Sequence, residues 1–182
     1  MLGAPVARRL ADAGYLLRVL ARDPGRAQVE FGKVAEIAQG DVTRAETLPP
    51  AVRDCQWLYV SLRGNFDAGD YAAVECQGLG KLLAAARLAG VTRVGIISGA
   101  GRTVENAHRL PVRIKLQAEE LVRSSGMAWM IFRCTHFMES LDLFVRGDKA
   151  VIIGSQPHAY HYLAAADYAT MVARAFPCEA AA

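Results

Sequence analysis

The sequence has few of the features that mark secreted, membrane or metal-binding proteins. Its four cysteines are widely spaced and none forms a Cys-x-x-Cys pair; they are Cys55, Cys76, Cys134 and Cys178. This spacing disfavours a disulfide framework or a zinc site and is typical of a reducing compartment. No apolar run reaches the roughly 18 residues of a membrane span, and the N-terminus lacks the basic-then-apolar order of a signal peptide. We therefore expect a cytoplasmic protein that binds neither a membrane nor a metal ion.

Strong charge is also lacking. The 182 residues carry a formal net charge of +3, without a block of like charges, and this mild, scattered charge argues against a nucleic-acid partner. Hydrophobic residues make up 53% of the chain, which is enough to build one sizeable core. We expect a single domain over residues 1–182.

Apolar runs that suit buried strands alternate with stretches of helical periodicity. The expected strands are residues 16–21, 34–38, 56–62, 94–98 and 128–133. The longest helical pattern covers residues 71–89, and another has Pro111 in its first turn and ends at Gly126. This alternation predicts an α/β fold with a parallel sheet, right-handed crossovers and helices on both faces.

Two short polar segments predict further helix starts. Asp23 stands before Pro24, an order that is typical of a turn leading into a helix. Thr43 and Glu46 have the spacing of a capping box, in which the threonine caps the exposed amides and the glutamate reaches back. A last helix is expected over residues 165–175.

The first ten residues are typical of the end of a glycine-rich dinucleotide loop that continues into a helix. With the strand after Gly14, they form the second half of a βαβ unit. Gly3 has no Cβ and stands where the helix N-terminus would meet a pyrophosphate. The alternative is a glycine that merely survives in a truncated start.

Arg22 ends the strand that follows this helix, where a dinucleotide fold faces the adenosine ribose. An acidic residue there accepts a hydrogen bond from the 2′-hydroxyl, whereas a guanidinium binds a 2′-phosphate. Arg22, with Arg26 nearby, therefore favours NADP(H) over NAD(H). The alternative is a solvated surface arginine.

Ligands of such folds bind beyond the carboxyl ends of the strands. The segments that follow the expected strands make up what we call the carboxyl-end rim: Arg22, Asp41, Ser61–Gly64, Ser98–Gly101 and Cys134–Phe137.

Short motifs recur in a fixed order from Leu2 to Ala175. They include Leu2-Gly3, Val19-Leu20-Ala21-Arg22-Asp23, Gln39-Gly40-Asp41-Val42-Thr43, Gly90-Val91, Ile97-Ser98, Lys115-x-x-x-Glu119, Ser125-Gly126, Arg133 and Phe137-Met138-Glu139. This ordered series resembles the NmrA-like branch of the atypical short-chain dehydrogenases. The resemblance implies a Rossmann-like, three-layer NAD(P)-binding domain and an NADPH-dependent oxidoreductase of a small molecule. The alternatives are a non-catalytic NADP(H)-sensing regulatory or assembly protein, and an inactive remnant.

The resemblance also implies roles for individual residues. The cofactor-binding set is Gly3, Arg22, Asp41, Val42, Ser61, Leu62, Arg63, Ser98 and Lys115. Lys115 holds the nicotinamide ribose and, with Ser98, forms the catalytic pair, while Asp41 accepts a hydrogen bond from the adenine amino group. The segment of His136, Phe137 and Met138 faces the substrate. The alternative for Lys115 is an exposed helical lysine beside Glu119. The alternative for Asp41 is an ordinary loop aspartate.

The chain departs from the family pattern at the catalytic tyrosine and at both ends. Pro111 stands four residues before Lys115, where the family has its tyrosine, and Tyr160 and Tyr162 offer a replacement only if the tail folds back over the site. The first strand of the pattern, two of its loop glycines and much of its C-terminal region have no counterpart. That strand is central in the family, so its absence leaves its neighbours unpaired. We therefore expect that the sheet rearranges, that the chain forms a homodimer or binds a protein partner, or that the start codon was placed too far downstream. We favour the last explanation.

Overall fold

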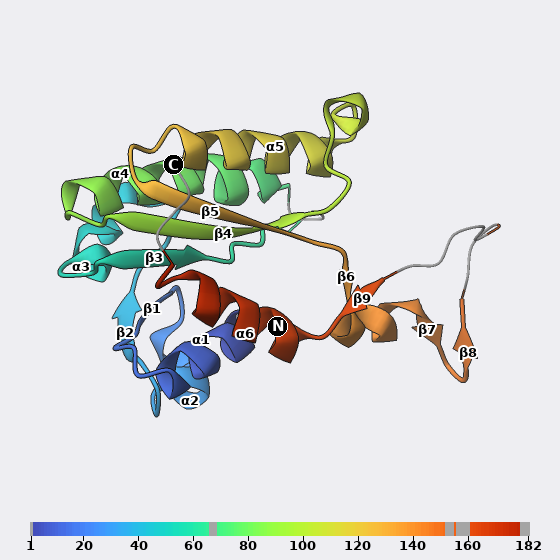
Figure 1. Ribbon diagram of the computed structural model, residues 1–182, viewed down its shortest axis with the longest axis horizontal. Coiled ribbons are helices and arrows are strands. Elements are labelled where there is room, and N and C mark those ends of the chain that lie inside the picture. Colours follow the sequence, from blue (N-terminus) through green and yellow to red (C-terminus); the bar gives the residue numbers. More distant parts are fainter. Residues whose placement is uncertain (1, 66–68, 152–154, 156–160, 179–182) are drawn as a thin grey trace.

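In the computed structural model, residues 2–65, 69–151, 155 and 161–178 are described (Figure 1). The α-helices are α1 Gly3–Asp12, α2 Pro24–Phe31, α3 Pro49–Val52, α4 Leu79–Leu88, α5 Leu110–Arg123 and α6 Ala165–Ala175. The main strands are β1 Arg18–Ala21, β2 Glu36–Gln39, β3 Trp57–Val60, β4 Arg93–Gly99 and β5 Ala128–Cys134. Four two-residue strands follow: β6 His136–Phe137, β7 Val145–Arg146, β8 Lys149–Ala150 and β9 Tyr162–Leu163.

The main strands form two parallel sheets. β1 pairs with β2 from Arg18 opposite Glu36 to Ala21 opposite Gln39. β4 lies between β3 and β5 in the larger sheet. Within the described residues, no strand pairs with both β1 and β3. The parallel pairing and the alternation with helices confirm the predicted α/β class.

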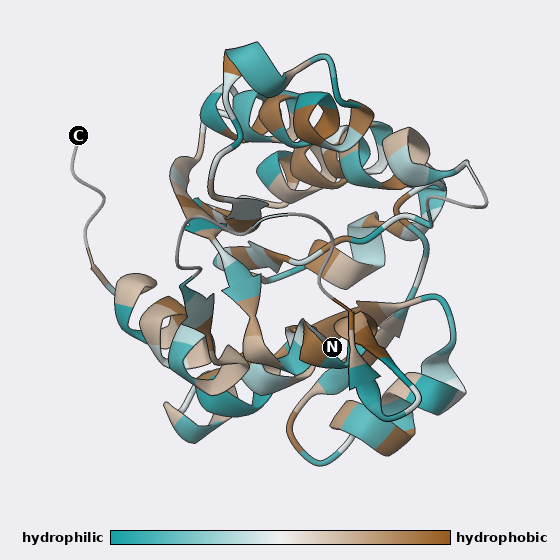
Figure 2. Ribbon diagram, turned by 90° about the vertical axis from the view of Figure 1, so that its right-hand side faces the viewer, coloured by the Kyte–Doolittle hydropathy of each residue, from teal (hydrophilic) through white to brown (hydrophobic). Residues whose placement is uncertain are grey.

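Successive side chains of the larger sheet point to two different hydrophobic cores, because the side chains of a strand alternate between its faces. Val94 and Ile96 of β4 face the core under α4 and α5. Tyr59 and Phe132 face the second core, which α1 and α6 build on the opposite side. Each of these helices carries both hydrophobic and hydrophilic residues around its ribbon (Figure 2). Helices therefore cover both faces of this sheet, as the sequence predicts.

Aromatic rings and one arginine connect the smaller sheet to the larger. The Tyr15 ring, just before β1, lies 5.3 Å from the Trp57 ring of β3, and the Trp57 ring lies 5.7 Å from Phe176. Arg18 Nη1 of β1 donates to the Arg53 carbonyl at 2.6 Å. These contacts hold β1 beside the first residue of β3 without backbone hydrogen bonds between the two strands.

The helix starts are partly as predicted. Asp23 Oδ1 accepts a hydrogen bond from the Arg26 amide at 3.0 Å and caps α2, and Pro111 lies in the first turn of α5. The predicted capping box at Thr43 is wrong, because the Thr43 amide and hydroxyl donate to Asp41 instead, and the 3₁₀ turn that follows, Ala45–Thr47, has no side-chain cap. None of the described helices has the length and apolar character that a bilayer crossing requires.

The helix expected over residues 71–89 forms, but its first part is wider than an α-helix. Residues Ala73–Gly78 are a π-helix that continues directly into α4. A π-helix adds a residue to the turn and often marks a functional site. It turns Glu75 into the protein, where the side chain is buried.

Phe176 holds α6 against the larger sheet, and its removal tests this packing. The ring is 2% exposed and fits over Gly95, where a Cβ would lie 2.9 Å from ring carbons. We predict that Phe176→Ala lowers the free energy of unfolding by about 3–5 kcal/mol, as measured by urea denaturation. Leu88→Ala is the control: Leu88 is 86% exposed, and its loss should cost less than about 0.5 kcal/mol. Equal effects would contradict the packing.

Candidate functional site

Most of the carboxyl-end rim lies at the carboxyl ends of the strands in the two parallel sheets. Arg22 follows β1 and Asp41 follows β2, and these strands are paired up to their last residues, Ala21 and Gln39. Ser61–Gly64 follows β3, and Gly99 ends β4. Since parallel strands end at the same edge of a sheet, Arg22 and Asp41 lie together at the edge of the smaller sheet, and Ser61–Gly64 and Gly99 lie together at the edge of the larger one.

The structure brings Arg22 and Asp41 together at the ends of β1 and β2. The Thr43 amide and hydroxyl donate to Asp41 Oδ1 at 2.9 Å and 2.8 Å. The Thr43 amide is the largest cause that lowers the pKa of Asp41, and the nearby positive charge of Arg22 lowers it further. Asp41 is thus an ionised acceptor, and Arg22 is an exposed cation beside it.

Gly3 is the first residue of α1, and the N-terminus of this helix has no side-chain cap and no acidic residue in its first turn. A Cβ added to Gly3 would meet no described atom within 4 Å. Packing of the described residues therefore does not require a glycine here. Free amides and the positive end of the helix dipole suit an anion such as a phosphate.

Lys115 is bound inside the protein rather than exposed on its helix. Its Nζ lies 2.5 Å from Glu75 Oε2, and the two side chains are 18% and 3% exposed. The other carboxylate oxygen of Glu75 accepts from the Gly64 amide at 3.1 Å. The alternative of an exposed lysine beside Glu119 is therefore wrong. The pair connects α5, the π-helix and the loop after β3.

The surroundings of this ion pair are apolar and closely packed. A cavity of only about 10 Å³ adjoins the pair, which is about the room that one water molecule needs. Its apolar lining consists of Val60, Leu62, Leu79, Ile96, Ile97 and Ala118. Leu62, predicted to bind the cofactor, thus lines this small cavity. A charged pair in such a place is expensive to bury unless both partners stay together.

Glu75 was not singled out from the sequence. Its only signal was an acidic residue four positions before Leu79, on the apolar face of an expected helix. Arg102 was missed as well. Its Nε atom is buried, and the described residues offer it no hydrogen-bond partner. It lies against Gly99, where a Cβ would stand 2.5 Å from Nε. An unsatisfied donor at the end of β4 suits an acceptor or an anionic group of a ligand.

Ser98 is turned into the protein. Its hydroxyl donates to Glu119 Oε1 at 2.7 Å, and Glu119 is fully buried. Arg133 donates to both oxygens of this carboxylate, at 3.0 Å and 2.5 Å, and Arg123 donates to it at 2.9 Å. Glu119 thus joins α5 to β4 and β5, and the observed contact of Ser98 is structural. Its ligand contact stays a prediction.

The remaining predicted residues differ in accessibility. Ser61 and Arg63 are exposed on the loop after β3, and Val42 is buried in the core against Gly78. Phe137 is also buried, 5.5 Å from the Tyr168 ring.

His136 and Met138 lie on the surface, and their substrate role stays a prediction. Of the two tyrosines proposed as replacement phenols, Tyr162 lies 6.1 Å from the His136 ring, and Tyr160 falls outside the described residues.

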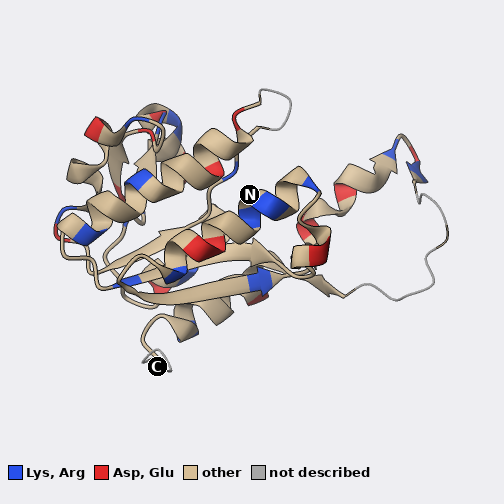
Figure 3. Cartoon of the chain, turned by 90° about the horizontal axis from the view of Figure 1, so that it is seen from above, with Lys and Arg blue, Asp and Glu red and all other residues tan. Residues whose placement is uncertain are grey.

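Charged residues of both signs are spread over the molecule rather than gathered on one face (Figure 3).

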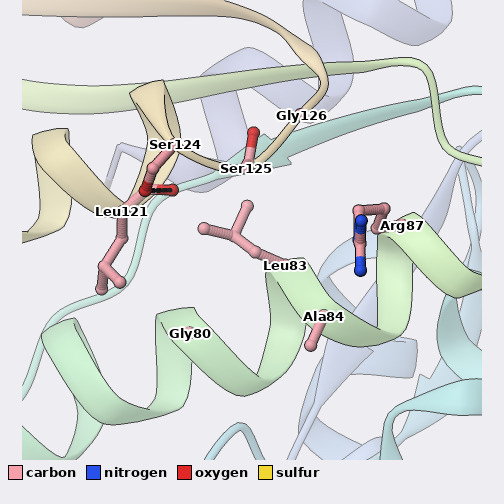
Figure 4. Close-up of a pocket in the computed structure, with 8 residues that line it drawn as sticks. All are labelled: Gly80, Leu83, Ala84, Arg87, Leu121, Ser124, Ser125 and Gly126. Atoms are coloured by element: carbon pink, nitrogen blue, oxygen red, sulfur yellow. Dashed lines mark hydrogen bonds between the residues drawn. The ribbon is translucent and has the colours of Figure 1, made fainter.

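A hollow of about 370 Å³ lies apart from the candidate site, between the ends of α4 and α5 (Figure 4). Its lining includes Arg87 and Gly126, which precede β4 and β5 in the chain. The hollow is therefore near the amino ends of these strands, at the edge opposite the candidate site.

Residues 1–176 match a family described as NAD(P)H-binding. An NAD(P)H azoreductase of Xenophilus azovorans is 26% identical over 148 residues, which are 80% of this chain and 48% of the azoreductase. The photosystem II assembly factor Ycf39 of Guillardia theta is 28% identical over 144 residues, 77% of this chain and 45% of that protein. The chain spans about half the length of these curated relatives.

Among solved structures, the NADPH-dependent quinone oxidoreductase of Escherichia coli, in complex with NADPH, superposes with a TM-score of 0.75. The superposition covers 97% of this chain and 62% of the oxidoreductase, at 20% sequence identity. At this identity the similarity shows the fold. It confirms the Rossmann-like architecture predicted from the sequence.

Glu119 offers a test of the polar network under the site. Burial alone would raise the pKa of Glu119, but the hydrogen bonds from Arg133 and Ser98 prevail and lower it. Since this pKa is lower in the folded chain, the stability it contributes is present at neutral pH and lost as the pH falls below about 4. We predict that Glu119→Gln costs roughly 2–4 kcal/mol at neutral pH, measured by urea unfolding, and progressively less in acid.

Glu120→Gln is the matched control on the next residue. Glu120 is 73% exposed and lies 3.8 Å from Arg123, so its neutralisation should change the unfolding free energy by less than about 0.5 kcal/mol at any pH. A difference between wild type and Glu119→Gln that does not shrink in acid would contradict the assignment of the lowered pKa to Glu119.

Proposed function

The chain belongs to the NAD(P)H-binding family, and from this premise we propose that it is an NADPH-dependent oxidoreductase of a small molecule. We propose that residues 1–182 form one dinucleotide-binding domain. The observation that carries the proposal is the set of chemically suitable groups that follow the parallel strands or begin α1: the Gly3 helix end, Arg22 beside Asp41, the Glu75–Lys115 pair and the unsatisfied Nε of Arg102.

Each of these groups suits a different part of a dinucleotide. The uncapped N-terminus of α1 suits the pyrophosphate, Asp41 accepts from the adenine amino group, and Arg22 binds the 2′-phosphate. The Lys115 ammonium has three N–H donors, of which Glu75 occupies one, so the ribose hydroxyls of the nicotinamide half can use another. These residues fit the cofactor, which supplies a hydride when bound in its reduced form.

The names of two similar proteins support the class of acceptor that we propose. The azoreductase and the quinone oxidoreductase are named for conjugated acceptors that take up two electrons. We propose quinones or azo compounds as the first substrates to test. The purified chain should oxidise NADPH in their presence, followed by the loss of nicotinamide absorbance.

A second candidate function is a non-catalytic NADP(H) sensor or assembly protein. Pro111 in place of the family's tyrosine favours it, as does the similarity to a protein named as a photosystem II assembly factor. The sensor predicts NADPH binding without turnover of any acceptor, and a protein partner whose affinity changes with the cofactor.

The preference for NADP(H) can be tested at Arg22. A guanidinium–phosphate contact contributes about 1.5–3 kcal/mol, so we predict that Arg22→Ala weakens NADPH binding at least about tenfold and leaves NADH binding nearly unchanged, as measured by calorimetric titration. Arg87→Ala, in the hollow at the opposite edge, is the matched control and should bind both dinucleotides as the wild type does. An equal loss for NADPH and NADH would contradict the role of Arg22.

A further inference from the structure

A tyrosine lies next to the buried ion pair, although none stands at the expected position four residues before Lys115. Tyr71 opens the helical segment after the loop that follows β3 and is partly buried. The loop packs closely on it, since a Cβ on Gly64 would lie 2.5 Å from the Tyr71 Cα. The same Gly64 donates its amide to Glu75. Tyr71 and the ion pair therefore belong to one small structural unit at the carboxyl-end rim.

Four charged side chains act on the Tyr71 hydroxyl or on its nearest partner. Burial is the largest cause that raises the pKa of Tyr71, and the charge and hydrogen bond of Glu75 raise it further. Arg102 and Arg63 act in the opposite direction, while Lys115 compensates the charge of Glu75. The phenol is therefore protonated at neutral pH, and Arg102 and Arg63, which lower its pKa, favour the loss of this proton to an acceptor.

We propose that Tyr71 donates the proton in the reduction proposed above, and that Glu75, anchored by Lys115, positions its hydroxyl. The inference rests on the proposed function. In this proposal Tyr71, from another helix, takes the role of the family's tyrosine, whose position Pro111 occupies in this chain. The neighbouring Arg102, with its buried and unsatisfied Nε, is placed to hold the oxygen or nitrogen that becomes negatively charged.

The reduced dinucleotide is the reductant, and its hydride brings two electrons to the acceptor, which leaves a negative charge on a quinone oxygen or an azo nitrogen. The hydroxyl hydrogen of Tyr71 turns about the C–O bond toward that atom. The phenolic O–H bond breaks, an O–H or N–H bond forms on the product, and a proton from water then restores the Tyr71 phenol.

A pH titration of the near-ultraviolet phenolate absorbance tests the link between Tyr71 and Glu75 without any turnover. The spectrum of Tyr71→Phe, subtracted from that of the wild type, isolates the titration of Tyr71. We expect its midpoint to lie above the ordinary value of about 10 and to move down in Glu75→Gln, because the carboxylate charge is gone. A midpoint that does not respond to Glu75→Gln overturns the coupling.

Glu75→Gln leaves Lys115 without its counterion, which can prevent the variant from folding. A second variant therefore accompanies it. The double variant Glu75→Gln with Lys115→Met removes both buried charges together, which costs less than removing one. If the single variant does not fold, the midpoint of Tyr71 in the double variant decides the question in the same way.

Turnover tests the proton transfer itself. We expect Tyr71→Phe to lower kcat for NADPH oxidation by a quinone about 100-fold or more and to change the dissociation constant of NADPH less than about twofold. Tyr15→Phe, in the aromatic contact with Trp57, is the control and should keep the wild-type kcat.

The outcomes separate this inference from the proposed function. Full activity of Tyr71→Phe overturns the inference but leaves the proposed function standing. The same holds if Tyr162→Phe loses activity while Tyr71→Phe keeps it. If the wild-type chain binds NADPH but reduces no quinone or azo acceptor, the proposed function falls and the inference falls with it.

Discussion

The candidate site depends on one buried ion pair, Glu75 with Lys115. Neither charge is stable in this apolar setting without the other, because removing water from a lone charge costs several kcal/mol. The pair therefore fixes the π-helix against α5, and the bond from the Gly64 amide to Glu75 fixes the loop after β3 to both. Since this loop, α5 and the residues after β4 border the same edge, a single interaction determines much of the shape of the site.

A second buried carboxylate supports the same edge from within. Glu119 holds Ser98, Arg123 and Arg133 and so ties α5 to the two strands beneath it. The two carboxylates differ in what they leave available. Glu119 is surrounded by donors that belong to the chain, whereas Glu75 pairs with a lysine and has a tyrosine beside it. The first arrangement is structural, and the second is suited to chemistry.

The sequence predicts the order of the elements well, because apolar runs and glycine stops are local signals. The strands, the helix start at Asp23 and the placement of Arg22 and Asp41 at the carboxyl ends of strands are all found in the structure. Contacts between distant segments were not predictable in this way. Lys115 finds its partner forty residues upstream rather than four residues downstream, Thr43 bonds to Asp41 instead of capping a helix, and Arg102 owes its buried donor to the fold around Gly99. Spacing along the chain carries no signal for such choices.

Hydrogen exchange measured with and without NADPH tests the location of the site most directly. The account predicts slower exchange of backbone amides in residues 3–6, 22–26, 41–43, 61–64 and 99–102, which lie at the helix end and the strand ends that face the ligand. It predicts no change around Arg87 and Gly126 at the opposite edge. Protection confined to that hollow, or no protection at saturating NADPH, would contradict the account.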